Sequence, residues 1–393
     1  MDHVVKIKKG LDIQLEGIPS PKISNTPDSQ LYAIIPDDFV GLTPKVIVKP
    51  GEKVLTGSPV IHDKTHPNIV VTSPVSGEIV TIERGERRKV IKITIKPDAS
   101  QQALEFGRFD LENMDSSEIK DLLLKSGIFA FIKQRPYDIV ANPDTTPRDI
   151  FVTAFDSAPL APDYAFILKE EKQHFETGLK ALNKLTSGKV YVGISQRQPI
   201  DVKNATSVIF DGPHPAGNVG IQINHIAPID KGDTVWTMSA LDVLFIGRLF
   251  DKGIADFSRI VAVTGSEIDD PHYVRTRIGA SIASITQGMV KAVEYEQRYI
   301  SGNVLTGVKT DADGYIGATH SQITVIPEGN NYDEFLGWAS LNPHKYSTSH
   351  SYFSWLLGKK KKYTIDARIR GGERAIIICL LYTSPSPRDP KTS

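Results

Sequence analysis

The sequence predicts an α/β protein of several domains, and three patterns support this prediction. Residues 128–250 alternate strand-like and helix-like apolar runs, an order typical of a mainly parallel sheet with helices on its faces. Residues 31–97 contain short β-branched runs separated by Gly and Pro turns, and residues 255–330 contain short strands around one helix. We place the domains at residues 1–100, 101–254 and 255–330, followed by a truncated C-terminal region at 331–379 and a tail at 380–393.

The first domain is expected to be a small antiparallel β unit that also includes the N-terminal strand. That strand is expected at Val4–Ile7, before an irregular loop at Ile18–Ser29. Further strands are expected at Val46–Val48, Ile69–Val71 and Glu78–Ile82. The pattern resembles the barrel-sandwich hybrid of biotinyl and lipoyl domains, in which a lysine on an exposed hairpin carries the cofactor.

Lys64 falls near the position of that carrier lysine, so a cofactor-carrying arm is one interpretation of this domain. We favour a structural hairpin, because Pro67 follows closely and proline removes a donor from a β ladder. The charged run Glu83–Lys89 is expected to form a solvent-facing turn. A docking site for an acidic partner is the less favoured interpretation of that run.

The second domain is expected to hold a Rossmann-like, mainly parallel sheet. Asp115–Glu118 has the pattern of a helix N-cap, and Gly127 that of a helix end. The remaining predicted elements are the strand Asp149–Phe155, the helix Lys172–Leu185, the strands Lys189–Ile194 and Val208–Phe210, and an amphipathic helix over Trp236–Phe250.

Ligands in such sheets bind beyond the carboxyl ends of the strands, where two loops are predicted. The loop 212–217 has the sequence GPHPAG, and His214 lies between two prolines that restrict its backbone. It lacks the glycine spacing of a dinucleotide site and the Lys-Ser/Thr of a P-loop. One interpretation is a rigid turn whose histidine bonds a carbonyl; the other is a loop that meets a protein partner or a quinone-like ring.

The second loop, Asp156–Asp163, follows a predicted strand and begins and ends with an aspartate. A general acid or a metal ligand is one interpretation of these carboxylates. Hydrogen bonds to the backbone of their own turns are favoured, because aspartate commonly makes them in loops rich in Pro and Ser.

The third domain is expected to be a β-grasp unit. Arg275 and Arg277 would share one strand face, where solvation or ion pairing is favoured over a substrate site. Asp311–Gly314 lacks the third acid and the closing glutamate of a calcium loop, so we expect no calcium site there. The predicted elements are strands at Arg259–Gly265, His272–Gly279, Tyr299–Gly302 and Ile323–Ile326, and a short helix near Ser281–Ile285.

Beyond residue 330, the aromatic-rich segment Tyr346–Leu357 is expected to be helical. Residues 380–393 have no periodic apolar pattern, which is typical of disorder. We expect a foreign tail that follows a truncated C-terminal region.

The bulk composition excludes several classes of function. Lys and Arg together number 46, as do Asp and Glu, so nothing indicates a nucleic-acid groove or a polybasic membrane anchor. The chain has one cysteine, Cys379, which is too few for a four-cysteine zinc site or an iron–sulfur cluster. The polar N-terminus lacks the apolar core of a signal peptide, and no window of the chain has the pattern of a membrane span.

Several runs together resemble the NqrA family, whose members belong to the bacterial Na+-translocating NADH:quinone oxidoreductase. They are KKGLDI at 8–13, RPYDIVANP at 135–143, AFDSAPLAPDY at 154–164, GPHPAG at 212–217 and the segment Trp236–Phe250. The resemblance covers about residues 4–378, nearly the whole chain. It also assigns the third domain to the SLBB type, which the flavin-bearing subunit of respiratory complex I shares.

The resemblance implies a peripheral subunit on the cytoplasmic face of the bacterial inner membrane. The complex of that family uses NADH, flavins, iron centres and ubiquinone, and it exports Na+. This subunit is expected to bind no flavin, cluster or metal of its own. Its expected partners are the other subunits, especially the quinone-reducing membrane subunit, and ubiquinone is a further candidate; nucleic acid is not.

No catalytic residue can be singled out from the sequence. The candidates for contact with a quinone or with another subunit are Gly212, His214, Gly217, Phe129, Phe131 and Trp236. A flavin- or NAD-binding oxidoreductase that acts alone is the first alternative, and a lipoyl or biotinyl carrier with the cofactor on Lys64 is the second.

Overall fold

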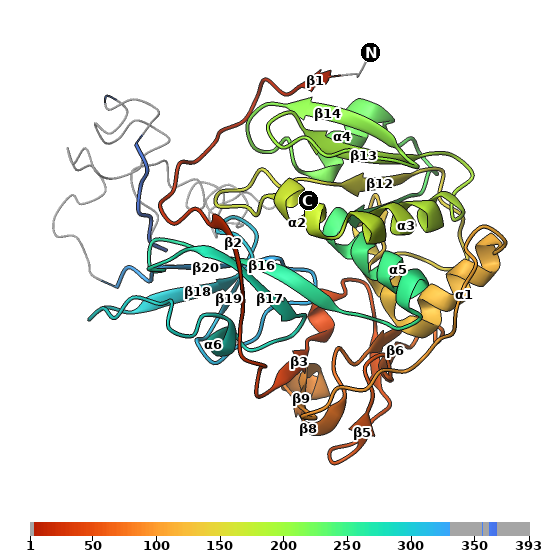
Figure 1. Cartoon of the computed structure of the whole chain (residues 1–393), viewed down its shortest axis with the longest axis horizontal. Helices are drawn as coiled ribbons and strands as arrows, with labels where there is room; N and C mark the ends of the chain where they lie inside the picture. The colour runs from red at the N-terminus through yellow and green to blue at the C-terminus, as the bar shows by residue number, and fades with distance from the viewer. Residues whose placement is uncertain (1–3, 331–355, 357–360, 368–393) are drawn as a thin grey trace, which may run out of the picture.

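The computed structural model describes residues 4–330, 356 and 361–367, and the strands within these residues form four sheets (Figure 1). The seven-stranded sheet belongs to the second domain, the six-stranded sheet to the third domain, and the two smaller sheets to the small β domain near the N-terminus. The expected helix Tyr346–Leu357, apart from Leu356, and the tail 380–393 lie outside the described residues. Within the described residues, no helix is long and apolar enough to cross a membrane.

The seven-stranded sheet confirms the predicted Rossmann-like domain. Its strands lie in the order β1-β14-β13-β12-β15-β10-β11. The first five strands are parallel to one another, whereas β10 is antiparallel to both β15 and β11. The bounds are β10 Lys133–Arg135, β11 Ile139–Val140, β12 Ile150–Thr153, β13 Val190–Ser195, β14 Thr206–Asp211 and β15 Val235–Ser239.

The helix predicted after Asp115 is confirmed as α1 (Ser116–Ser126). Asp115 and Glu118 form a capping box, because each side chain accepts the backbone N–H of the other, at 2.9 and 2.8 Å. Gly127 ends the helix with a φ of 78°, a conformation that glycine adopts without steric cost.

The helices of this domain include two that the sequence did not reveal. α3 (Lys172–Asn183) was expected, but α2 (Tyr164–Glu170) and α4 (Val219–Ile226) were not. Both are about two turns long, too short for a clear apolar period. α2 begins where the Asp163 carboxylate accepts the Phe166 N–H at 3.1 Å.

The expected helix over Trp236–Phe250 is wrong in its first residues and in its burial. Val235–Ser239 forms the strand β15, which its β-branched and aromatic residues favour. α5 (Ala240–Lys252) begins only after Ser239, whose hydroxyl accepts the Leu241 N–H at 3.3 Å. Every residue from Ala240 to Phe250 is buried, so α5 is a core helix with no solvent face.

The N-terminal segment does not pair within the first domain as expected. β1 (Val4–Lys6) pairs in parallel with β14 at the edge of the seven-stranded sheet. The expected loop Ile18–Ser29 contains the strand β2 (Ser20–Asn25), which pairs with β17 of the third domain. The first residues of the chain therefore connect two sheets that are built mainly from later residues, and the predicted domain boundaries stay a prediction.

The small β domain, whose type the family comparison below confirms, contains two antiparallel sheets. Its core is made of isoleucines that are fully buried, among them Ile61, Ile79, Ile93 and Ile95. The strands are β3 Tyr32–Ile34, β4 Pro44–Val46, β5 Lys53–Val54, β6 Pro59–Asp63, β7 Val70–Thr72, β8 Gly77–Arg84 and β9 Val90–Pro97, with a 3-10 turn, η1, at Pro36–Asp38.

Lys64 is exposed on the connection between β6 and β7. The buried Asp63 fixes the start of this connection, because its carboxylate accepts the N–H groups of Thr43 at 2.7 Å and His66 at 2.8 Å. The connection is therefore longer and more constrained than a two-residue hairpin turn.

The six-stranded sheet contains the four strands predicted for the third domain. Its order is β19-β18-β20-β16-β17-β2. Arg275 forms an ion pair with Glu171 at 3.5 Å, and Arg277 donates to Gln101 at 2.9 Å, so both arginines have structural partners. The bounds are β16 Ser258–Thr264, β17 His272–Arg277, β18 Gln297–Ser301, β19 Val308–Thr310, β20 Gln322–Pro327 and α6 Ile282–Ile285.

The buried helix α5 connects the second and third domains through charged side chains. Asp242 on α5 accepts a hydrogen bond from Arg259 on β16 at 2.5 Å, with both side chains less than a tenth exposed. Removing only one partner of a buried ion pair leaves an uncompensated charge, which typically costs about 3–5 kcal/mol.

We therefore expect Arg259→Met to lower the free energy of unfolding by about 3–5 kcal/mol, measured by urea denaturation. The double variant Asp242→Leu/Arg259→Met is expected to show a much smaller loss in the free energy of unfolding. As a control, Lys22→Met removes the exposed ion pair Lys22–Asp270 and is expected to cost under about 1 kcal/mol. Equal losses in the single and double variants would contradict this role for the pair.

Candidate functional site

A cleft lies at the point where the strand order of the seven-stranded sheet reverses. The chain adds β13 and β14 on one side of β12, and β15 on the other. The cleft has a volume of about 550 Å³, within the range of small-molecule sites. Its walls are the loop after β12, the loop after β14, the start of α5, strand β10 and, from the third domain, Asn303–Thr306 with Thr319.

The N-terminal segment holds the backbone of the loop that carries His214. The Asp12 carboxylate accepts the His214 N–H at 3.0 Å, and the His214 carbonyl accepts the Leu11 N–H at 2.9 Å. Gly10 packs against this carbonyl, where a Cβ atom would lie 2.0 Å from the oxygen. The position of the loop therefore depends on a carboxylate 202 positions earlier in the chain.

Hydrogen bonds also fix the His214 ring. The Ser157 hydroxyl oxygen accepts the Gly217 N–H at 2.8 Å, so its own proton is available for His214 Nδ1 at 3.0 Å. With Nδ1 as the acceptor, the neutral ring carries its proton on Nε2. Among the described residues Nε2 has no hydrogen-bond partner, and His214 lines the cleft. When the Ser157 hydroxyl donates to Nδ1, His214 presents an Nε2–H donor to the cleft.

Cations line the opposite wall. Arg135 on β10 forms an ion pair with Asp138 at 3.2 Å, and Lys133 lies 3.8 Å from the same carboxylate. An adjoining pocket of about 210 Å³, which shares Lys133 and Arg135 with the cleft, is lined by Asp242. Burial raises the pKa of the Asp242 carboxyl, while the charge of Arg259 opposes that shift. This wall therefore presents charges of both signs.

Two more titratable groups line the floor of the cleft. Burial raises the pKa of the Asp156 carboxyl, although the Ala158 N–H that it accepts at 2.8 Å and the charge of His214 oppose this. Burial also raises the pKa of Tyr164, and Ser239 is a hydrogen-bond partner of its hydroxyl. Tyr164 is therefore a phenol, and thus a donor, over the physiological pH range.

The third-domain wall is held by Asp38 and His320. The Asp38 carboxylate accepts the Ala318 N–H at 2.7 Å. His320 Nδ1 lies 2.8 Å from the Ser301 hydroxyl, which itself accepts the Gly317 N–H at 2.9 Å. These contacts fix residues 317–320, including Thr319 at the cleft.

Comparisons with known proteins agree with this architecture. Residues 5–98 match the NqrA N-terminal barrel-sandwich hybrid domain, residues 114–255 the NqrA second alpha/beta domain, and residues 260–312 the NQRA C-terminal domain. The chain is 35% identical over 393 residues to the A subunit of the Na(+)-translocating NADH-quinone reductase of Neisseria meningitidis serogroup B. It is 37% identical over 395 residues to the protein of that name from Serratia proteamaculans. Each match covers 98% of this chain and 87% of the relative.

The chain belongs to the NqrA family of Na+-translocating NADH-quinone reductases. The family resemblance and the three domain types predicted from the sequence are thus confirmed. Among solved structures, an NAD+-reducing NiFe hydrogenase in the air-oxidized state is 7% identical with a TM-score of 0.36, and the match covers 77% of this chain and 69% of that one. This similarity is too low to support an argument.

The structure brings only some of the predicted contact residues to the cleft. His214 and Gly217 line it. Gly212 lines a neighbouring pocket of about 300 Å³ beneath the N-terminal segment. Phe129 and Trp236 are fully buried and pack edge to face, with their ring centroids 5.6 Å apart. Their burial does not fit a direct contact with a quinone or with another protein.

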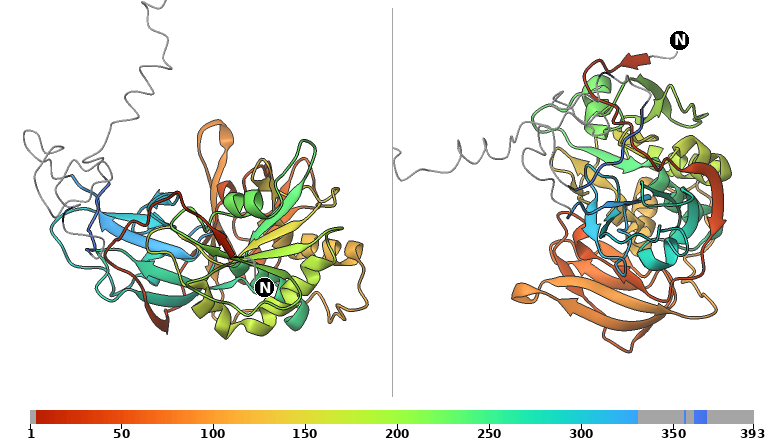
Figure 2. Two further views of the ribbon diagram at one scale, coloured as in Figure 1. Left: turned by 90° about the horizontal axis from the view of Figure 1, so that it is seen from above. Right: turned by 90° about the vertical axis from the view of Figure 1, so that its left-hand side faces the viewer.

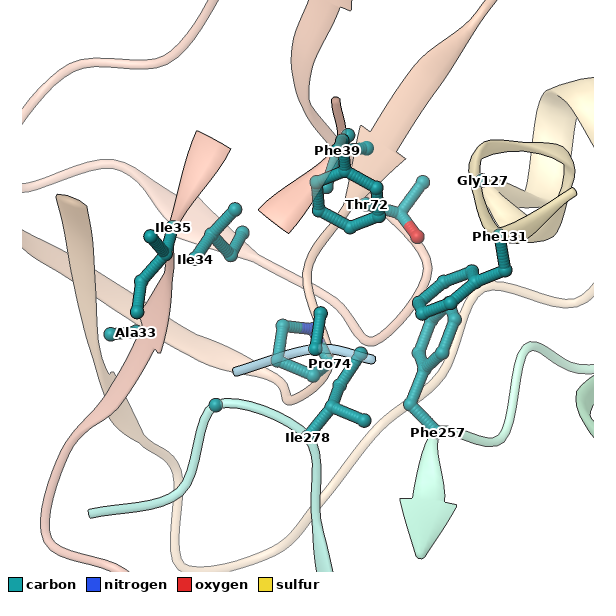
Figure 3. A pocket seen from close by; sticks show the side chains of 13 residues that line it. Ala33, Ile34, Ile35, Phe39, Thr72, Pro74, Gly127, Phe131, Phe257 and Ile278 are labelled. Atoms are coloured by element: carbon teal, nitrogen blue, oxygen red, sulfur yellow. The ribbon is translucent and has the colours of Figure 1, made fainter. Parts of the chain in front are cut away.

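Phe131 lies between a small apolar cavity and a pocket that adjoins the cleft. It lines this adjoining pocket of about 210 Å³, and its ring also borders the cavity together with Phe39, Phe257 and Pro74 (Figure 3). This cavity lies where the three domains meet and has a volume of about 20 Å³, room for about one water molecule. As it stands, the cavity is too small for a ring.

Most polar groups of the cleft give no signal in the sequence. Lys133, Arg135 and Tyr164 line it but stand in short elements whose sequence does not distinguish a cleft from open solvent. For Asp156 and Asp163 the favoured interpretation is confirmed, because each accepts a backbone N–H of its own turn, from Ala158 and Phe166. Within the described residues, no group of three or more His, Cys, Asp and Glu could hold a metal ion.

The pKa values of Asp38 and His320 predict opposite effects of pH. Burial raises the pKa of Asp38 to about 6. The stability that this group contributes is therefore fully present below the pKa that it has in the unfolded chain, and it is lost as the pH rises through 6. Burial, aided by the charges of Arg259 and Lys133, lowers the pKa of His320 to about 4. The stability that this group contributes is fully present above the pKa that it has in the unfolded chain, and it is lost as the pH falls towards 4.

We expect Asp38→Asn to be more stable than the wild type at pH 8, by about 1–3 kcal/mol, with the difference vanishing towards pH 4. His320→Gln is expected to become more stable relative to the wild type below pH 6 instead. Urea denaturation at several pH values measures both. Profiles parallel to the wild type would show that neither group titrates as described.

Proposed function

We propose that this chain is a peripheral subunit of a Na+-translocating NADH-quinone reductase, on the cytoplasmic face of the bacterial inner membrane. It supports quinone reduction and binds no flavin or iron–sulfur cluster of its own. It docks on the other subunits, especially the quinone-reducing membrane subunit, and its cleft borders the quinone. Support for membership of such a complex is the similarity over 98% of the chain to proteins named as its A subunits.

The chemistry of the cleft carries the proposal that no nucleotide cofactor binds here. In dinucleotide-binding sheets, the first strand is followed by a glycine-rich turn whose N–H groups approach the pyrophosphate. After β12, this chain instead has Pro159 and Pro162, which lack an N–H, and the carboxylate of Asp156. A phosphate at that place would meet a carboxylate and few donors.

The same cleft suits a neutral ring with carbonyl groups. Phe131 and Phe155 supply apolar surface. His214 Nε2–H, the Tyr164 hydroxyl and the Lys133 ammonium supply donors from different sides. An apolar site with a few convergent donors is what a quinone head group requires.

His214→Ala tests the cleft within the complete complex. We expect the complex to assemble and its quinone reductase activity to fall about fivefold to tenfold, the effect of losing one hydrogen bond. The matched control is His225→Ala, since His225 is exposed on α4 and bonds the Ile221 carbonyl of its own helix. Co-purification of the subunits measures assembly, and the initial rate with NADH and ubiquinone measures activity.

Gly217→Val tests the position of the loop. A Cβ atom at Gly217 would lie 2.5 Å from the Ser157 backbone nitrogen, so the His214 loop must shift. Intact assembly with reduced quinone reduction supports a site at the cleft, whereas lost assembly indicates a scaffold role. Unchanged activity in both variants would refute the quinone-proximal proposal. A yellow isolated chain with tightly bound flavin would refute the proposal that it lacks a cofactor.

A further inference from the structure

The β8–β9 hairpin projects from the small β domain (Figure 2). Its two strands, Gly77–Arg84 and Val90–Pro97, are the longest of that domain. In both views of Figure 2 the tip, drawn in orange, extends beyond the body of the molecule. All residues from Glu83 to Lys89 are exposed, as the sequence predicted for this run.

Cations are concentrated at this tip. The segment 83–92 contains five Lys and Arg residues against two Glu residues, although the whole chain has no net charge. Lys92 is paired with Glu83, and Lys89 with Asp37. Arg84, Arg87 and Arg88 have no ion-pair partner in the described part of the chain, although Arg84 donates to the Arg88 carbonyl at 3.1 Å. The tip therefore carries a net positive charge that ion pairs in the described part of the chain do not neutralise.

The backbone of the tip adds a second observation. Arg87 and Arg88 have φ values of 51° and 60°, a conformation that glycine adopts more easily than arginine. Two consecutive arginines therefore stand where the backbone favours a smaller residue. Their side chains contribute nothing to the core, so a benefit to stability does not account for them.

Apolar side chains flank the cations. Ile91 is 39% exposed and Val80 is 41% exposed, and each is the extra residue of a β-bulge in the hairpin. Bulges turn side chains out of the regular ladder. The Ile91 Cδ1 atom lies over Gly85 at the turn, so apolar surface and exposed guanidinium groups without an ion-pair partner lie together at the tip.

We propose that the tip of this hairpin, Arg84 to Ile91, binds an anionic lipid surface. Arginine pairs with phosphate groups, and an adjacent aliphatic side chain partitions into the boundary between headgroups and acyl chains. This combination favours lipid over an acidic protein, which would not require the outward apolar groups. The inference rests on the proposed function, in which this chain lies next to a membrane.

Vesicle sedimentation with the full chain tests the proposal. One set of vesicles is phosphatidylcholine alone, and the other contains about one third phosphatidylglycerol. We expect binding only to the anionic vesicles, with a loss at high salt because ions screen surface charge. Since each cation near such a surface contributes about fivefold to binding, Arg87→Glu/Arg88→Glu should bind at least about 25-fold more weakly.

The matched control is Lys8→Glu/Lys9→Glu, which makes the same change of charge at two exposed residues beside β1, at the opposite end of the molecule (Figure 1). This variant should bind like the wild type. The proposal is overturned if the wild-type chain ignores anionic vesicles, if the hairpin variant still binds them, or if both variants lose binding equally.

Co-purification with the other subunits separates this inference from the proposed function. If the wild-type chain binds vesicles but never co-purifies, the proposed function fails while the lipid contact stands. If the hairpin variant binds vesicles normally but loses the other subunits, the tip docks on protein and the lipid proposal is wrong. Thermal unfolding of each variant confirms that the exposed tip can be changed without loss of the fold.

Discussion

The buried helix α5 determines how the second and third domains meet. Its two buried charged residues both have partners: Asp242 pairs with Arg259 of the third domain, and Arg248 pairs with Glu171 at the start of α3, 2.9 Å away. Glu171 also pairs with Arg275 of the third domain. A charge inside a core is tolerated only when it is paired. These pairs therefore require one arrangement of the two sheets, whereas apolar contacts alone would permit several.

Close helix packing on the other side of α5 reinforces this arrangement. Gly247 on α5 faces the His174 carbonyl of α3, where a Cβ atom would lie 1.7 Å from the oxygen. Glycine therefore lets the two helix backbones approach. Because α5 starts at the carboxyl end of β15, fixing the helix also fixes Ser239 at the floor of the cleft. The walls of the cleft follow from this packing, since Asn303–Thr306 and Thr319 come from the domain that Arg259 attaches.

The sequence predicted the type of most elements but not their long-range pairing. Periodicity and capping residues placed α1, α3 and the parallel strands other than β15, because those signals are local. The pairing of Val4–Lys6 with β14 joins residues about 200 positions apart, and nothing in three residues specifies that partner. Trp236 illustrates the ambiguity of a short apolar run, which fits a buried strand and a buried helix equally well. His214 was found because prolines mark its loop, whereas Lys133 lies in an ordinary strand and gave no signal.

The charges of the cleft discriminate between classes of ligand. Lys133 and Arg135 line the cleft and its adjoining pocket together with the carboxylates of Asp138, Asp156 and Asp242. Arg259, which pairs with Asp242, restores an approximate balance of charge. A flavin or nicotinamide nucleotide brings phosphate charges that need an excess of donors and cations. A neutral dione needs only hydrogen bonds, and it gains by leaving water for the faces of Phe131 and Phe155. The Rossmann-like order of strands thus places a cleft at the usual point, while the residues around it favour an uncharged ligand.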